Sequence, residues 1–190
     1  MKRIILFIVS MFTFIKAGEI NNNEFLQTQK YLCEDGSAEA CGIVGTIYSV
    51  EDFAKQYNVT IDYFIANKYL EKACNGNDGI GCFNLGVSFD LGEGVSKNNT
   101  KAYELYEKAC NLNHAMACYA MGGFFNAQNN EKQALEYFIK SCDLKNKDAC
   151  NNAGAIFFNN DNIDSAFTYF KKACEYGDNW GCKNMHTLEQ

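Results

Sequence analysis

The chain has 190 residues, ten cysteines, no proline and a formal net charge of −6. Arg3 is its only arginine, and an acidic surface without arginine is a poor match for nucleic acid or for bidentate phosphate recognition. We therefore expect no nucleic-acid partner, whereas cationic, neutral or peptide-like partners suit this charge balance.

Residues 1–17 are predicted to be a cleaved signal peptide. Two cations precede an apolar run from Ile4 to Ile15, and the small residue Ala17 follows it. The alternative, a membrane anchor, would need about 18–20 apolar residues, whereas this run has about a dozen. Removal of residues 1–17 takes away three cations and no anion, which leaves 14 lysines against 23 acids, a net charge of −9. We expect a secreted or periplasmic protein whose mature chain, 18–190, has no membrane segment.

The ten cysteines form five pairs with seven residues between the two members: Cys33 with Cys41, Cys74 with Cys82, Cys110 with Cys118, Cys142 with Cys150, and Cys174 with Cys182. The first members follow one another at intervals of 41, 36, 32 and 32 residues, which indicates one unit copied along the chain. On one continuous helix the paired Cα atoms would lie about 12 Å apart, whereas a disulfide needs about 7 Å or less. If the pairs are disulfides, the chain must reverse inside each of them.

Turn-forming residues occupy the positions between the paired cysteines, among them Asp35-Gly36, Asn75 to Gly79, Asn111, Asn113, Asn146 and Gly177-Asp178. Each disulfide would then join the end of one helix to the start of the next, and an even cysteine count in an exported chain is typical of such a framework. Zinc is the alternative. Close ligand pairs two to four residues apart are absent, however, and the only histidines are His114 and His186, which we expect at the surface. We therefore expect no metal and no cofactor.

The segment before each first cysteine predicts an amphipathic helix. Apolar residues recur eight, five, four and one positions before that cysteine, and alanine stands at the first of these positions in four copies: Ala66, Ala102, Ala134 and Ala166. A lysine two positions before the cysteine lies near the predicted helix end, where a cation is favoured: Lys72, Lys108, Lys140 and Lys172. We interpret these lysines as a solvated face.

The segment after each second cysteine predicts a second helix. Glycine stands four positions after that cysteine in four copies, Gly45, Gly86, Gly122 and Gly154, and its recurrence inside a helix favours a close helix crossing. The unit is therefore helix, turn, helix, loop, and about five units form one domain over residues 18–190. Two longer connections, 49–60 and 90–96, are expected at one edge of the array.

The run Leu85-Gly86, Phe89 and Gly92 to Val95, followed by Lys101-Ala102, Tyr106 and Lys108-Ala109, resembles the Sel-like repeat (SLR), a relative of the tetratricopeptide repeat. With a cysteine pair in every unit and a signal peptide, the chain resembles the Helicobacter cysteine-rich proteins, whose members often carry the name β-lactamase. The resemblance covers residues 24–186. It implies an all-α solenoid, a right-handed superhelix of α/α hairpins with one disulfide per repeat.

The resemblance also implies where a ligand would bind. In tetratricopeptide relatives one helix of each unit lines the concave face, and it corresponds here to the helix after each second cysteine. The ligand-contacting positions of those relatives correspond to two residues before that cysteine and to one, two and five residues after it. Here they include Phe83, Asn84, Tyr119, Asn151, Asn152, Trp180, Lys183 and Asn184. The asparagines would form a ladder along an extended peptide, interrupted at Ile43 and Ala120. The alternatives are ordinary surface polarity for the asparagines and gap filling between repeats for the aromatic residues.

The family resemblance further implies hydrolysis of penicillin-like substrates, but the sequence identifies no catalytic residue. No lysine follows three residues after any serine, two isolated histidines cannot build a hydrolytic metal site, and paired cysteines cannot act as nucleophiles. We therefore expect a monomer that binds a peptide, a protein or a peptidoglycan-like ligand in a concave groove. The alternative is a β-lactamase-type protein that binds or weakly hydrolyses β-lactams.

Overall fold

The computed structural model describes residues 21–189, and all regular structure in that range is α-helical. The predicted signal peptide lies outside the described residues. The helices are α2 (Asn22–Glu34), α3 (Ala38–Ser49), α4 (Glu51–Gln56), α5 (Tyr63–Asn75), α6 (Gly79–Leu91), α7 (Asn99–Asn111), α8 (Ala115–Ala127), α9 (Glu131–Asp143), α10 (Lys147–Asn159), α11 (Ile163–Glu175) and α12 (Asn179–Leu188). Within residues 21–189 no helix has the length and apolar character needed to cross a membrane.

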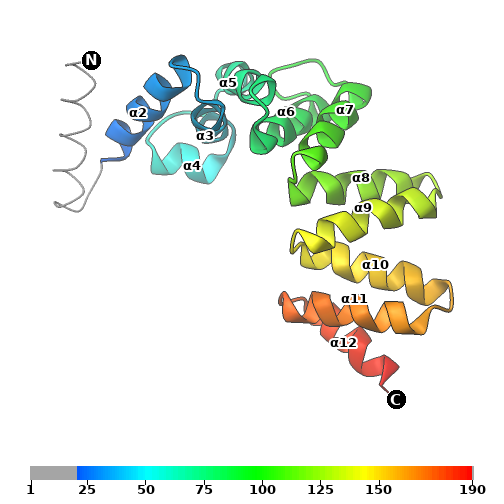
Figure 1. Cartoon of the computed structure of the whole chain (residues 1–190). Helices are drawn as coiled ribbons and strands as arrows, with labels where there is room; N and C mark the ends of the chain where they lie inside the picture. Colours follow the sequence, from blue (N-terminus) through cyan, green and yellow to red (C-terminus); the bar gives the residue numbers. More distant parts are fainter. Residues whose placement is uncertain (1–20, 190) are drawn as a thin grey trace.

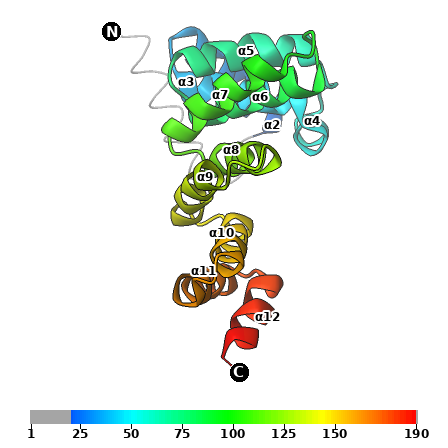
Figure 2. The same ribbon diagram turned by 90° about the vertical axis from the view of Figure 1, so that its right-hand side faces the viewer.

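Consecutive helices stack as hairpins into a curved array. Helices α2 to α7 are arranged along one direction, and α8 to α12 continue along a second direction (Figures 1 and 2).

Five disulfides staple the hairpins, and they join the predicted partners. The bonds link Cys33 to Cys41, Cys74 to Cys82, Cys110 to Cys118, Cys142 to Cys150, and Cys174 to Cys182. The Cα atoms of each pair lie 4.4–4.7 Å apart, so the chain does reverse inside every pair. The predicted all-α hairpin solenoid with one disulfide per repeat is therefore confirmed.

Each stapled reversal uses the same two positions. The third residue after the first cysteine has a positive φ, between 62° and 101°: Gly36, Asn77, Asn113, Lys145 and Gly177. The fourth residue is the N-cap of the next helix and accepts a hydrogen bond from the backbone N–H three residues further on: Ser37, Asp78, His114, Asn146 and Asp178. Residues that tolerate the left-handed region, followed by a capping side chain, thus end one helix and start the next.

The recurring glycines lie where an inner helix crosses the outer helix that follows it. A Cβ atom added at Gly45, Gly86, Gly122 or Gly154 would lie 2.5–2.7 Å from a side-chain carbon of Leu70, Tyr106, Phe138 or Phe170, respectively. The four recurring alanines of the outer helices are completely buried nearby. The predicted close crossing is confirmed, because no side chain fits between the paired helices.

Helices α3, α6, α8, α10 and α12 form the inner layer of the array. Among alternate helices, α3 contacts α6 and α10 contacts α12, whereas the outer helices α5, α7, α9 and α11 have no comparable contact with one another in the described residues. In a curved stack the helices of the concave side approach one another most closely. At these two places the helices that carry each second cysteine lie on the concave side.

Two expectations need correction. Three of the four recurring lysines join successive repeats: the amines of Lys108, Lys140 and Lys172 donate to the Cys74 carbonyl (2.7 Å), Asn111 Oδ1 (3.3 Å) and Asp143 Oδ1 (3.1 Å). The expected solvated face describes only Lys72, which is exposed. His114 is likewise no simple surface residue, because it is half-buried, caps α8 and stacks on Phe83 with ring centroids 4.6 Å apart.

Candidate functional site: an apolar groove on the inner face

A groove of about 420 Å³ opens at the N-terminal end of the inner face, where α2, α3, α4 and the start of α6 meet. Its lining consists of Phe25, Glu39, Gly42, Ile43, Thr46, Ile47, Phe53, Tyr57, Asp78 and Ile80. Most of these side chains are apolar, and the only charged ones are two carboxylates. This composition is typical of a site that takes an apolar group together with a cation.

The floor of the groove comes from α3 of the first repeat. Glu39, Gly42, Ile43 and Thr46 lie two residues before Cys41 and one, two and five residues after it. These are the positions that the resemblance to tetratricopeptide relatives implied for ligand contact, applied to the first unit. The eight residues predicted from the sequence came from units two to five, so the groove lies one unit earlier than that set.

The walls come from α2 and from the connection that follows α3. The connection 49–60 folds into α4, and its residues Phe53 and Tyr57 line the groove together with Phe25 of α2. The rings of Phe25 and Tyr57 lie 5.6 Å apart, and the Asn22 amide donates to the Gln56 carbonyl at 2.7 Å. The connection 49–60 thus contains a short helix, α4, which packs beside α3 (Figure 1).

Two carboxylates, Glu39 and Asp78, lie at the groove. Asp78 caps α6 by accepting from the Gly81 N–H at 2.6 Å. Burial raises the pKa of Asp78 and the Glu39 charge adds to this, while the Gly81 hydrogen bond and His114 oppose it. A Cβ atom at Gly42 would lie 2.5 Å from Asp78 Oδ1, so the glycine leaves room for the carboxylate against the floor. A cationic group bound here would relieve the repulsion between the two acids.

The sequence-predicted residues of units two and three lie beside the groove or between repeats. Asn84 donates to Thr46 Oγ1 at 2.9 Å, which joins it to the groove floor. Phe83 is half-buried and packs against Tyr106 and His114, and Tyr119 packs against Phe138 with centroids 5.9 Å apart. Both rings therefore fill space between repeats.

The remaining predicted residues lie at the C-terminal end of the inner face. Asn184 donates to Asn151 Oδ1 at 3.1 Å, and Asn152 is half-buried on the same helix as Asn151. Trp180 is 66% exposed, and the Lys183 amine lies 5.3 Å from the centre of its ring. The structure thus separates the predicted set into two groups: Asn84 bonds to Thr46 at one end, and Asn184 bonds to Asn151 at the other.

Two kinds of hydrolytic group, a free thiol and a metal cluster, are absent from the described residues. All ten cysteines are in disulfides, so none has a free thiol. Within residues 21–189 no three His, Cys, Asp or Glu side chains are grouped to hold a metal ion. A repeat scaffold of this kind is suited to protein binding.

The fold defines a disulfide-stapled helical-repeat protein. The Sel1 repeat family model matches residues 55–78, 79–114, 115–146 and 148–178. The chain belongs to the Sel1 repeat family.

The relatives agree with this assignment. A stretch of 70 residues is 37% identical to the "Putative beta-lactamase HcpC" of Helicobacter pylori, covering 37% of this chain and 21% of that protein. The match thus spans about a fifth of the length of HcpC, and it confirms the resemblance to the Helicobacter proteins.

Two solved structures share the fold. The Escherichia coli protein c5321 is described as a protective antigen with an SLR fold. Its structure has a TM-score of 0.72 at 18% identity, and the match covers 87% of this chain and 37% of c5321. A Sel1 repeat protein from Oxalobacter formigenes has a TM-score of 0.69 at 24% identity, and the match covers 86% of this chain and 72% of that protein. At these identities the likeness establishes the fold.

Proposed function

We propose that this chain is an exported scaffold that binds an extended segment of a partner protein along its inner face. The main contact is the groove formed by α2, α3, α4 and α6. The observation that carries the proposal is the collection of exposed apolar side chains at the family's ligand-contact positions and around them. Phe53 is 43% exposed and Ile80 is also exposed, and both line the same groove. Exposed apolar surface that is concave and rimmed by polar groups marks binding sites in soluble proteins.

The charges of the groove specify the partner segment further. Glu39 and Asp78 line it and no cation does. An apolar side chain can enter between Ile43, Phe53 and Ile80, while a neighbouring lysine or arginine pairs with the carboxylates. The mature chain is acidic overall, so long-range attraction acts in the same direction. The favoured segment therefore combines a bulky apolar residue with an adjacent cation.

Export is part of the same proposal. Five disulfides persist only in an oxidising space, and residues 1–17 have the composition of a secretory signal. A periplasmic location would place peptidoglycan within reach, and peptidoglycan-like fragments form the second ligand class to test. We propose a monomer, which leaves the inner face open to its partner.

Hydrolysis of β-lactams is the competing function, and the observation that favours it is the name of the HcpC relative. The described residues contain no free thiol and no group of three metal-binding side chains. Incubation of the purified oxidised protein with a chromogenic cephalosporin decides this point. Turnover above that of a reduced, unfolded sample would support the hydrolase, and its absence would remove it.

The binding proposal is tested by incubating the oxidised protein with an array of immobilised peptides and peptidoglycan fragments. Retained peptides should share an apolar residue next to lysine or arginine. The variant Glu39→Gln should weaken retention of these peptides, whereas Glu136→Gln, a matched exposed acid on α9, should not. Failure to retain any peptide, or equal retention by both variants, would contradict the proposed groove contact.

A further inference from the structure

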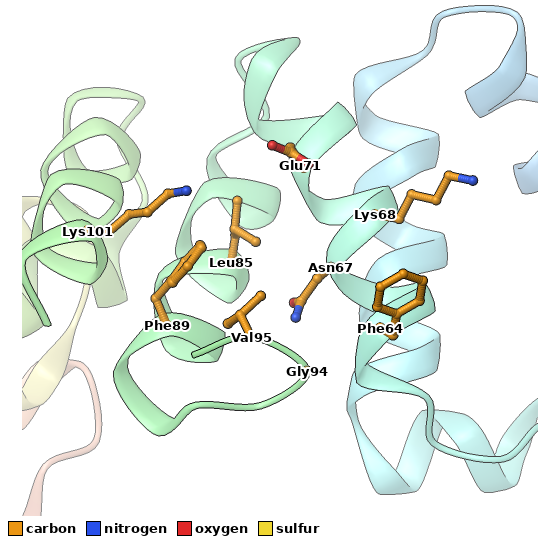
Figure 3. Close-up of a pocket in the computed structure, with 9 residues that line it drawn as sticks. All are labelled: Phe64, Asn67, Lys68, Glu71, Leu85, Phe89, Gly94, Val95 and Lys101. Atoms are coloured by element: carbon orange, nitrogen blue, oxygen red, sulfur yellow. The ribbon is translucent and has the colours of Figure 1, made fainter. Parts of the chain in front are cut away.

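A second pocket lies on the opposite side of the array, between the outer helices α5 and α7. It has a volume of about 260 Å³ and is lined by residues of α5, α6, α7 and the long connection that follows α6: Phe64, Asn67, Lys68, Glu71, Leu85, Phe89, Gly94, Val95 and Lys101. Drug-sized ligands occupy pockets of about 300–1,000 Å³, so this one suits a smaller group. Figure 3 shows Asn67, Leu85, Phe89 and Val95 around one space.

Asn67 is the unusual residue of this pocket. Its side chain is only 7% exposed, and its amide nitrogen donates to the Glu93 carbonyl at 2.7 Å. Its Oδ1 atom has no hydrogen-bond partner among the described residues. The bond to Glu93 fixes the orientation of the amide, because a reversed amide would place two oxygens together. This oxygen has almost no accessible surface, so a donor reaches it only when neighbouring side chains move aside, and a ligand that brings an N–H donor there satisfies it.

A comparison between repeats shows that this unit departs from the others at two positions. One residue after the recurring alanine, the other units have Tyr103, Leu135 and Phe167 in place of Asn67. Two residues before the alanine, they have Thr100, Lys132 and Asp164 in place of Phe64, which is 76% exposed. This unit thus has a buried polar side chain and an exposed aromatic ring. At the same two positions the other units have a half-buried apolar side chain and an exposed polar one. Asn67 holds the connection after α6 through its bond to the Glu93 carbonyl, whereas the Phe64 ring is largely exposed.

The charged groups at the pocket have opposite signs. Glu71 and Lys101 both line it, and they form no salt bridge with each other in the described residues. The Lys101 amine lies 4.3 Å from the centre of the Phe89 ring. Lys68 also contributes to the lining, but Figure 3 shows its amine directed away from Asn67 and Val95. The pocket therefore offers an anion, a cation, a buried acceptor and apolar surface within a small volume.

We propose that this pocket binds a free α-amino acid with an apolar side chain. The ligand's ammonium group donates to Asn67 Oδ1 and faces the Glu71 carboxylate, and its carboxylate pairs with Lys101. Its side chain contacts Phe64, Phe89 and Val95. Each polar feature of the pocket is matched by one group of this ligand, and an amino acid of this kind fits the small volume. The site is independent of the inner-face groove, so the two proposals can fail separately.

The test is an NMR titration of the full oxidised mature chain with L-phenylalanine. Saturable shifts are expected at the Asn67 side-chain amide and at the Val95 methyl groups. Two analogues test the polar contacts: 3-phenylpropionate lacks the nitrogen, and L-phenylalaninamide lacks the carboxylate. We expect each to bind at least fivefold more weakly than L-phenylalanine. Binding of 3-phenylpropionate as tight as that of the amino acid would overturn the assigned role of Asn67.

A pair of variants tests the location. Phe64→Thr installs the residue of the following repeat at an exposed position, so it should leave the fold intact while weakening L-phenylalanine at least threefold. Phe158→Thr removes an exposed ring of α10 and should leave the affinity unchanged. Equal affinity of Phe64→Thr and the wild type, or no saturable shift with any of the three compounds, would overturn the proposal.

Discussion

The N-terminal half of the array, α2 to α7, and the C-terminal half, α8 to α12, are built from the same stapled hairpin but differ in what surrounds it. The C-terminal repeats follow one another at 32 residues, and short loops join their helices. The N-terminal half contains both long connections, one folded as α4 and the other closing the pocket beside Asn67. The inner-face groove and the pocket beside Asn67 both belong to this half. The staple thus maintains the scaffold, and the insertions create the candidate sites.

The largest expected effect tests whether the staple is equivalent in the two halves. Removing the bond between Cys74 and Cys82 with C74A/C82A, or that between Cys142 and Cys150 with C142A/C150A, opens a loop of about nine residues and should cost about 2.5 kcal/mol in the loop-entropy model. Both pairs have Cα separations of 4.4–4.6 Å, so the two losses should be similar. Urea unfolding of both variants measures this. A much larger loss in one half would show that the staples are not interchangeable.

The next effect concerns the helix crossing in the regular half. A Cβ atom at Gly122 would lie 2.5 Å from the Phe138 ring, whereas one at the adjacent Gly123 would meet nothing within 4 Å. G122A should therefore cost about 1–3 kcal/mol through overpacking. G123A should gain up to about 1 kcal/mol through helix propensity. Thermal unfolding of the two variants separates steric contact from propensity, and equal shifts would contradict the described crossing.

A smaller effect distinguishes His114 from Asn146, which caps the corresponding helix of the next unit. The Nδ1 atom of His114 accepts from the Ala117 N–H at 3.3 Å, which requires a neutral ring. Burial lowers the pKa of His114 and the Asp78 charge opposes this. Because the folded pKa lies below the unfolded value of about 6.5, the unfolded chain binds more protons just below that pH, so stability falls as the pH drops.

The measurement is the free energy of unfolding as a function of pH between 5 and 8. Loss of the cap should cost about 0.5–1 kcal/mol at the acid end. H114N, which installs the residue of the next unit, should remove this part of the pH dependence. An unchanged profile in the variant would assign the pH dependence to other groups.

The smallest effect concerns Lys145, which has a φ of 67° where other units have glycine or asparagine. A side chain such as lysine is unfavourable in this region, and asparagine tolerates it better. K145N should therefore raise stability by about 0.5 kcal/mol, since substitutions that fit the local backbone yield gains of this size. The control N113K in the preceding unit should lower stability by a similar amount.

Local rules and spacing predicted most of the fold. The eight-residue cysteine separation required a reversal if the pairs were disulfides, and the glycine register predicted the close crossings that the structure shows against Leu70, Tyr106, Phe138 and Phe170. Both depend on contacts between neighbouring segments. The lysine bridges between repeats escaped prediction, because the distance from Lys108 to the Cys74 carbonyl depends on how two units stack.

The candidate groove was predicted only in part. The contact positions that the resemblance implied beside each second cysteine coincide with the groove floor at the first unit, whereas the residues predicted from the sequence came from units two to five. The groove forms at the first unit because Phe25 and Phe53 come from α2 and α4, and how such segments fold back on α3 cannot be read from the repeat. Applying the same rule to Cys41 would have pointed to Ile43 and Thr46.

The central claim is that the groove of the N-terminal half binds a peptide segment and the C-terminal half does not. The most direct measurement is the Kd of a retained peptide for Phe53→Ala and for Phe158→Ala, which remove similarly exposed rings from the two halves, 43% and 47% exposed. We predict at least a tenfold weaker affinity for Phe53→Ala, as for the loss of a central aromatic contact, and no change for Phe158→Ala. Equal affinities of the two variants would contradict the account.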